Sequence, residues 1–179
     1  MGLFLQTAII PHCDEKTVRG VLESLAQSED SMELDVAKCL FSANDKGVQI
    51  LFNDYCMGYE RLAECLSKET GRDVLFPYIY DGDFWGYFFC KDGALADQFV
   101  PIPDYFGEEA ALPDVSGNAA LIAERFHVSE EDVARYLTSW APDDLDGAEK
   151  AFGEDRFPYG DCWQMVDFTA KLGWPWPWD

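Results

Sequence analysis

The sequence lacks most of the groups on which the common enzyme classes depend. It has only two histidines, and it contains no G-x-S-x-G motif, no phosphate-binding P-loop and no H-E-x-x-H motif. The usual carriers of hydrolase and phosphotransferase chemistry are therefore missing. His12 and Cys13 are neighbours, but adjacent residues on a strand point to opposite faces, which makes a thiolate–imidazole pair awkward. Catalysis by paired carboxylates stays open because acids are abundant, yet the sequence favours a binding protein over an enzyme.

Long apolar runs and metal-binding cysteine patterns are also missing. Residues 3–10 are apolar, but this run is too short to span a bilayer, and no basic residue precedes it as in a signal peptide. The six cysteines include no C-x-x-C pair. A structural zinc site is therefore not indicated, and we expect the thiols to act as small buried hydrophobic groups. We expect a cytoplasmic protein with no cofactor and no membrane partner.

Positive charge is scarce. Only 13 basic residues stand against 34 acidic ones, which gives a net charge of -21 at pH 7. Such a field repels nucleic-acid phosphates and anionic lipids, and it attracts basic proteins. The acids are spread over the whole chain, so solubility alone is the simplest explanation of the charge. We expect no nucleic-acid partner, and the charge favours a basic protein as partner.

What the sequence does contain is an alternation of strand-like and helical segments. Residues 3–10 have the pattern of a strand, and residues 15–27 carry apolar side chains at helical spacing. Turn residues 44–47 join two strand-like runs into a hairpin, and Gly71 ends the second helix. The predicted strands are 3–10, 33–42, 47–53 and 74–80, and the predicted helices are 15–27 and 55–69. This β-α-β-β-α-β order is the split β-α-β arrangement of ferredoxin-like α+β folds.

The sheet is expected to continue in an aromatic hairpin, followed by a C-terminal helical region. Runs 84–90 and 94–100 meet at Asp92-Gly93, a strong hairpin signal. Prolines and glycines break the pattern from 101 to 117. Helices are then predicted from Asn118 to about 126, from Ser129 to about 140 and from Asp161 to 172. We expect a sheet domain over 1–106 and a helical extension over 107–179, packed on it as one compact unit.

Residues 119–137 resemble a helix-turn-helix, a common DNA-binding motif. The would-be recognition helix, however, begins with Glu130, Glu131 and Asp132. In a DNA-binding protein these positions meet bases and phosphates, which would repel carboxylates. A plain helical hairpin is the simpler interpretation.

Three carboxylates form a candidate site for a divalent cation. Asp81 and Asp83 have the D-x-D spacing of some such sites, and Asp104 can supply a third oxygen from the following loop. The alternative is a tight connection between strands, because aspartate hydrogen-bonds its own backbone and glycine accepts positive φ. The first interpretation predicts calcium or magnesium binding, and the second predicts only a turn.

Residues 174–178 alternate tryptophan with proline. This pattern suits an extended polyproline-like segment whose indoles can lie on an apolar groove. The indoles of Trp174, Trp176 and Trp178 could form a platform for a partner or a sugar ring. The alternative is a segment that docks on its own domain and covers the aromatic hairpin, since exposed tryptophan promotes aggregation.

A resemblance adds to these observations. The segments Tyr78 to Tyr87, Asp92 to Phe99 and Pro103 to Phe106 resemble part of a group of uncharacterised bacterial proteins, in which an aromatic hairpin precedes a Pro-x-Tyr-Phe turn and a helical end. More widely, the chain is similar to small acidic bacterial proteins of immunity and antitoxin-like families. The resemblance covers about a sixth of the chain and implies no catalytic residue.

Two functions follow as hypotheses. The first is a protein-binding or inhibitory module, similar to immunity proteins, that recognises a basic protein through acidic and aromatic side chains. Its candidate partner-binding residues are Asp81, Asp83, Trp85, Tyr87, Trp174, Trp176 and Trp178. The second is an enzyme or small-molecule binder whose carboxylate-lined pocket holds a divalent metal at Asp81, Asp83 and Asp104.

Overall fold

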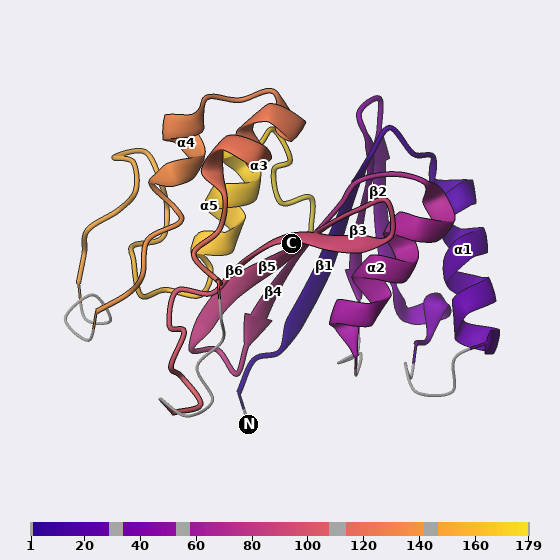
Figure 1. Ribbon diagram of the computed structural model, residues 1–179, viewed down its shortest axis with the longest axis horizontal. Coiled ribbons are helices and arrows are strands. Elements are labelled where there is room, and N and C mark those ends of the chain that lie inside the picture. The colour runs from indigo at the N-terminus through magenta and orange to yellow at the C-terminus, as the bar shows by residue number, and fades with distance from the viewer. Residues whose placement is uncertain (1, 29–33, 53–57, 108–113, 142–146, 179) are drawn as a thin grey trace. The chain divides into compact units, whose positions relative to one another are not determined.

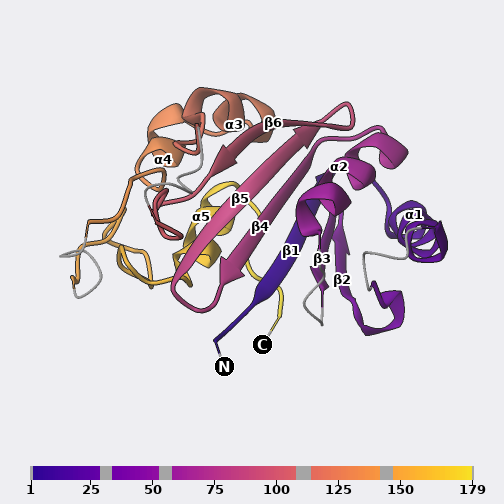
Figure 2. The same cartoon turned by 60° about the horizontal axis from the view of Figure 1, so that its bottom comes forward.

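The structure is a computed structural model that describes residues 2–28, 34–52, 58–107, 114–141 and 147–178. Within these ranges six strands form a sheet in the order β2-β3-β1-β4-β5-β6 (Figure 1, Figure 2). The strands are β1 (Leu5–Pro11), β2 (Leu40–Asn44), β3 (Gly47–Phe52), β4 (Val74–Tyr80), β5 (Phe84–Lys91) and β6 (Ala94–Phe99). The helices are α1 (Glu15–Ser28), a 3-10 turn η1 (Val36–Lys38), α2 (Tyr59–Thr70), α3 (Ala119–Phe126), α4 (Glu130–Ala134) and α5 (Gln164–Lys171).

The fold is α+β, with an antiparallel sheet. Strand β3 pairs with both β1 and β2 in antiparallel register, so it lies between them. The connections β4–β5 and β5–β6 are only a few residues long, which allows a hairpin and no crossover. Strands β5 and β6 follow β4 in the sheet, so the predicted extension by an aromatic hairpin is present, while the exact ferredoxin-like topology stays a prediction.

The predicted hairpin of β5 and β6 is confirmed, and the geometry of its turn explains why it forms. Asp92 and Gly93 have φ values of 53° and 78°, the left-handed conformation that a two-residue hairpin turn of this hand needs. Gly93 is required for a second reason, because a Cβ atom there would lie 2.8 Å from the Cβ of Lys68. Its amide also donates a hydrogen bond to the Ser67 hydroxyl at 3.2 Å.

Two predicted elements are shorter in the structure. The predicted strand 33–42 begins only at Leu40, because Asp35 accepts a hydrogen bond from the amide of Ala37 and starts η1 instead. The predicted helix from Ser129 to about 140 ends at Ala134, although Ser129 caps it as expected by accepting from the amide of Asp132 at 3.1 Å. Residues 55–57 of the predicted second helix lie outside the described residues, and α2 begins at Tyr59.

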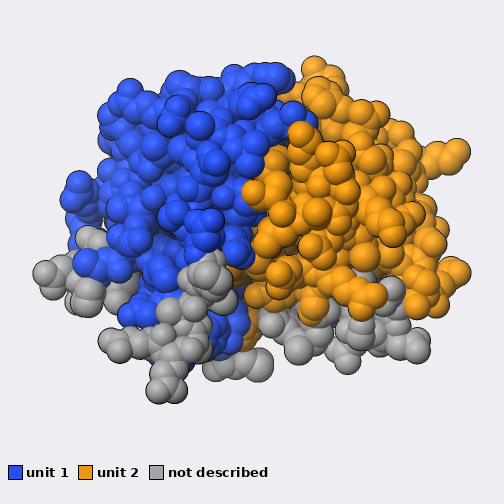
Figure 3. All heavy atoms as spheres, in the orientation of Figure 1, with its two compact units in different colours: residues 1–3, 79–86, 97–179 blue, residues 4–78, 87–96 orange. Residues whose placement is uncertain are grey.

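The chain divides into two compact units (Figure 3). Unit 1 comprises residues 1–3, 79–86 and 97–179, and unit 2 comprises residues 4–78 and 87–96. The division falls within β4, β5 and β6, whereas the sequence predicts a boundary after residue 106. The buried side chains of unit 2 are mainly aliphatic and include Ile9, Ile10, Val18, Leu22, Leu62 and Leu66. Those of unit 1 include several large aromatic side chains, among them Trp85, Phe99, Tyr136 and Phe168.

None of the helices in the described ranges has both the length and the apolar character needed to cross a bilayer.

Candidate functional site

Four aromatic rings gather in unit 1 around the turn between β4 and β5. Tyr80 ends β4 and Phe84 begins β5, and their rings stack with centroids 5.5 Å apart. Tyr105 packs edge-on against Phe84 at 5.0 Å, and Phe106 packs edge-on against Tyr80 at 5.4 Å. Edge-to-face pairs of this kind add stability beyond the area that they bury. We call these four residues the aromatic edge.

One residue of the aromatic edge is buried in the core, and another is exposed to solvent. Phe84 is buried, whereas Phe106 is 56% exposed, more than any other large hydrophobic residue in the described part of the chain. Leu3 is 38% exposed and lies next to Gly82, a residue of the turn between β4 and β5. The Phe106 ring is held in place by two neighbours, Tyr80 and Tyr105, and an exposed ring of this kind is a typical anchor for a protein partner.

Two of the predicted carboxylates, Asp81 and Asp83, lie close to the ring of Tyr105. Asp81 is half-buried, and both Asp83 and Asp104 are exposed. Asp81 and Gly82 have positive φ values of 52° and 79°, and the amide of Asp83 donates to the carbonyl of Tyr80 at 2.9 Å. The tight connection that the D-G-D sequence predicts as one alternative is thus present.

The hydroxyl of Tyr105 donates a short hydrogen bond to the carboxylate of Asp83. This bond ties the loop after β6 to the β4–β5 turn and fixes the spacing between rings and carboxylates. The bond to Asp83, together with desolvation and the negative charges of Asp83 and Asp81, raises the pKa of Tyr105 to about 12. Tyr105 therefore stays a neutral donor throughout the physiological range.

The titration of Tyr105 tests this contact. We expect Asp83→Asn to lower the pKa of Tyr105 from about 12 towards the ordinary tyrosine value of about 10, because the hydrogen bond and the charge that favour the neutral phenol are removed. Difference absorbance against Tyr105→Phe, followed through alkaline pH, isolates this one phenol. Asp104→Asn is the matched control and should leave the titration unchanged. An ordinary pKa in the unmodified protein would show that the contact is absent in solution.

The metal-site hypothesis gains no support from the geometry. Among the described residues, no three or more His, Cys, Asp or Glu side chains are grouped so that they could hold a metal ion. Asp81, Asp83 and Asp104 all lie in that described part. Asp83 is instead engaged by Tyr105. Binding of a divalent cation at these residues stays a prediction.

Three residues predicted to bind a partner are enclosed in the structure. Trp85 and Tyr87 are 0% exposed, and Trp174 is also buried. The reason is that β5 is covered on both faces, so its side chains do not alternate between core and solvent. These three side chains belong to the core, and the partner-binding role predicted for them stays a prediction.

The tryptophan-rich segment is partly docked on its own unit. The amide of Trp174 donates to the carbonyl of Thr169 at 2.9 Å. Trp176 and Trp178 are half-buried, and Trp176 packs edge-on against Trp163 at 5.9 Å and against Trp178 at 4.9 Å. Trp174 is therefore packed against its own unit, as one of the two alternatives predicts. Trp176 and Trp178 keep part of their surface in solvent.

Phe106 is the residue that sequence reasoning missed. It lies in a loop rich in proline and glycine, where no strand or helix periodicity indicates which side chains are exposed. The available signal was compositional: Tyr105 and Phe106 are adjacent to each other and are the two aromatic residues of the segment 101–117.

No family model, curated protein or solved structure matches this chain. The resemblance of residues 78–106 to immunity-type proteins therefore stays an interpretation of the sequence.

Proposed function

We propose that the protein is a binding module that docks on a basic protein through the aromatic edge and its surrounding carboxylates. The observation that carries this proposal is the exposed ring of Phe106, held against Tyr80 and Tyr105, with the carboxylates of Asp81 and Asp83 close to Tyr105. Aromatic anchors are common in protein-binding hot spots, and charge of one sign near the anchor favours a partner of opposite charge. Inhibition of the basic partner, as immunity-type proteins achieve it, is the form of binding that we propose.

The net charge of the chain supports this choice of partner. At -21, the protein attracts a positively charged surface over distances of about a Debye length, roughly 8 Å at physiological ionic strength. Such steering raises the association rate, while the desolvated ring slows dissociation. The same field repels nucleic acids, so a basic protein is the partner of choice.

The proposal also covers the fold that presents the aromatic edge and the compartment in which the protein acts. We infer that a ferredoxin-like β-α-β-β-α-β core, extended by β5 and β6, presents the aromatic edge. The partial order β2-β3-β1-β4, with β3 between β1 and β2, supports this inference. A bacterial cytoplasm is the setting that we propose, in line with the thiol-rich composition.

The test is a binding measurement on matched alanine variants. The partner is first captured from host lysate with the tagged protein and then purified for titration by calorimetry. Phe106→Ala should raise the dissociation constant about thirtyfold, since an anchor of this kind contributes about 2 kcal/mol. Leu40→Ala is the control, because Leu40 is also exposed, at 48%, but lies on β2 in unit 2. Equal losses in both variants, or no loss in Phe106→Ala, would contradict the proposal.

A further inference from the structure

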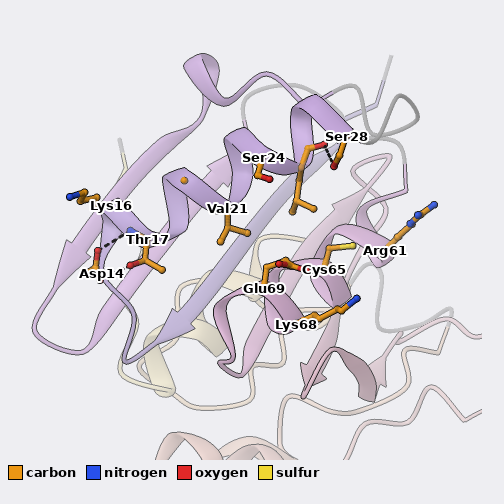
Figure 4. Close-up of a pocket in the computed structure, with 12 residues that line it drawn as sticks. Asp14, Lys16, Thr17, Val21, Ser24, Ser28, Arg61, Cys65, Lys68 and Glu69 are labelled. Carbon is orange, nitrogen blue, oxygen red and sulfur yellow. Dashed lines mark hydrogen bonds between the residues drawn. The ribbon is translucent and has the colours of Figure 1, made fainter.

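A groove lies between α1 and α2 in unit 2 (Figure 4). It encloses about 800 Å³, which is within the range of small-molecule sites. Val21 and Leu25 of α1 supply an apolar wall, and Cys65 and Glu69 of α2 lie on the opposite side. The remaining lining residues are small or charged: Asp14, Lys16, Thr17, Gly20, Ser24, Ser28, Arg61 and Lys68.

Gly20 is the unusual residue of this groove. It lies in the middle of α1, where glycine is among the least favourable residues because it loses the most backbone freedom. No packing contact explains it, because a Cβ atom at this position would meet nothing within 4 Å. A second hollow, lined by Glu15, Lys16, Arg19, Gly20 and Glu23, adjoins the same position. The missing side chain therefore leaves the helix surface open to an approaching ligand.

Basic residues outnumber acidic ones along the groove, whereas acidic residues prevail in the chain as a whole. Three bases and two acids line it, in a protein where acids outnumber bases by 34 to 13. Asp14 is already engaged, because its carboxylate accepts from the amide and hydroxyl of Thr17 at 2.9 and 2.8 Å. Lys16 and Lys68 take part in none of the ion pairs formed between described residues. Two ammonium groups are therefore left for a ligand.

We propose that this groove binds a small organic anion, consisting of an apolar body and one carboxylate, phosphate or sulfonate group. The body lies on Val21 and Leu25 over the open backbone at Gly20, and the anionic group pairs with Lys16 or Lys68. The Ser24 hydroxyl, which lines the same wall of the groove, is a further donor. A cation beside an apolar surface is the composition expected of such a site. The inference is independent of the proposed protein partner.

Two fluorescent probes that share one ring system test the proposal on the full chain. Anilinonaphthalene sulfonate carries an anionic group, and phenylnaphthylamine is the same body without it. We expect the sulfonate probe to bind saturably, one per chain, and more tightly than the neutral probe, although the net charge of the protein opposes an anion. The double variant Lys16→Gln, Lys68→Gln should weaken the sulfonate probe about tenfold. Lys91→Gln, which lies outside the groove, should leave it unchanged.

A groove-filling variant separates loss of the site from loss of the fold. Gly20→Leu should abolish probe binding and yet raise the melting temperature by about 2–4 °C, since leucine is a better helix former and meets open space. Gly153→Leu, which also meets open space but lies in unit 1, should leave binding unchanged. The proposal is overturned if no saturable binding occurs, if Gly20→Leu still binds the probe, or if the neutral probe binds as tightly as the sulfonate.

Discussion

Replacing Trp85 with alanine is expected to lower the free energy of unfolding by about 3–5 kcal/mol, the typical cost of removing a large buried aromatic side chain. Trp85 is 0% exposed and packs between Phe99 and Phe168, with ring centroids 5.2 and 5.0 Å away. Its indole N–H donates to the Oε1 of Gln164 at 3.2 Å. The substitution removes both the packing and the one hydrogen bond that the Gln164 side chain makes within the described residues.

Urea unfolding followed by circular dichroism measures this loss, and Trp85→Phe separates its two parts. Phenylalanine keeps most of the packing but has no donor for Gln164, so a smaller loss of about 1–2 kcal/mol is expected. If Trp85→Ala cost less than Trp85→Phe, or if neither changed the free energy of unfolding, Trp85 would not lie in the core of unit 1.

Asp167→Ala is expected to lower the free energy of unfolding by about 2–3 kcal/mol, because it leaves two part-buried backbone donors without acceptors. The carboxylate of Asp167 is buried and accepts from the amides of Arg156 and Phe157, both at 2.8 Å. These two bonds fix the segment before α5, which includes Asp155, to the helix itself. Asp155 in turn accepts from the hydroxyl of Tyr136 at 2.9 Å.

The control for Asp167 is Arg156→Ala, which removes an ion pair and leaves the backbone bonds intact. The Arg156 Nε lies 3.6 Å from Asp167, but its side chain is 64% exposed, so this pair contributes less than about 1 kcal/mol. Equal losses from the two variants, measured by the same urea titration, would show that the salt bridge and not the backbone bonds holds the segment.

Local chemistry explains which parts of the fold could be predicted. The Asp92-Gly93 hairpin and the Ser129 cap depend on residues a few positions apart, and the structure confirms both. The helix ending at Gly71 is another such case, because Gly71 takes the left-handed conformation at its C-terminus. The arrangement of carboxylates such as Asp167 was not predictable, since its partners are backbone amides more than nine positions away.

Of the candidate site, only the charged residues could be predicted from the sequence. Asp81 and Asp83 were identified from their spacing, and the structure places both beside aromatic rings. Trp85 was assigned to the same surface because tryptophan is common in binding sites, but burial of β5 on both faces encloses it. Sequence periodicity does not show that second layer, because the covering residues lie far away in the chain. The exposed ring, Phe106, comes from a loop with no periodicity at all.

The most direct test of the proposed function is the salt dependence of partner binding in two charge-matched variants. Asp81→Asn with Asp83→Asn removes two charges at the aromatic edge, and asparagine tolerates the positive φ at position 81. Glu124→Gln with Glu130→Gln removes two exposed charges on α3 and α4. The account predicts that the first pair raises the dissociation constant about tenfold at low salt and flattens its salt dependence, while the second pair changes neither. Identical behaviour of the two pairs would contradict a docking site at the aromatic edge.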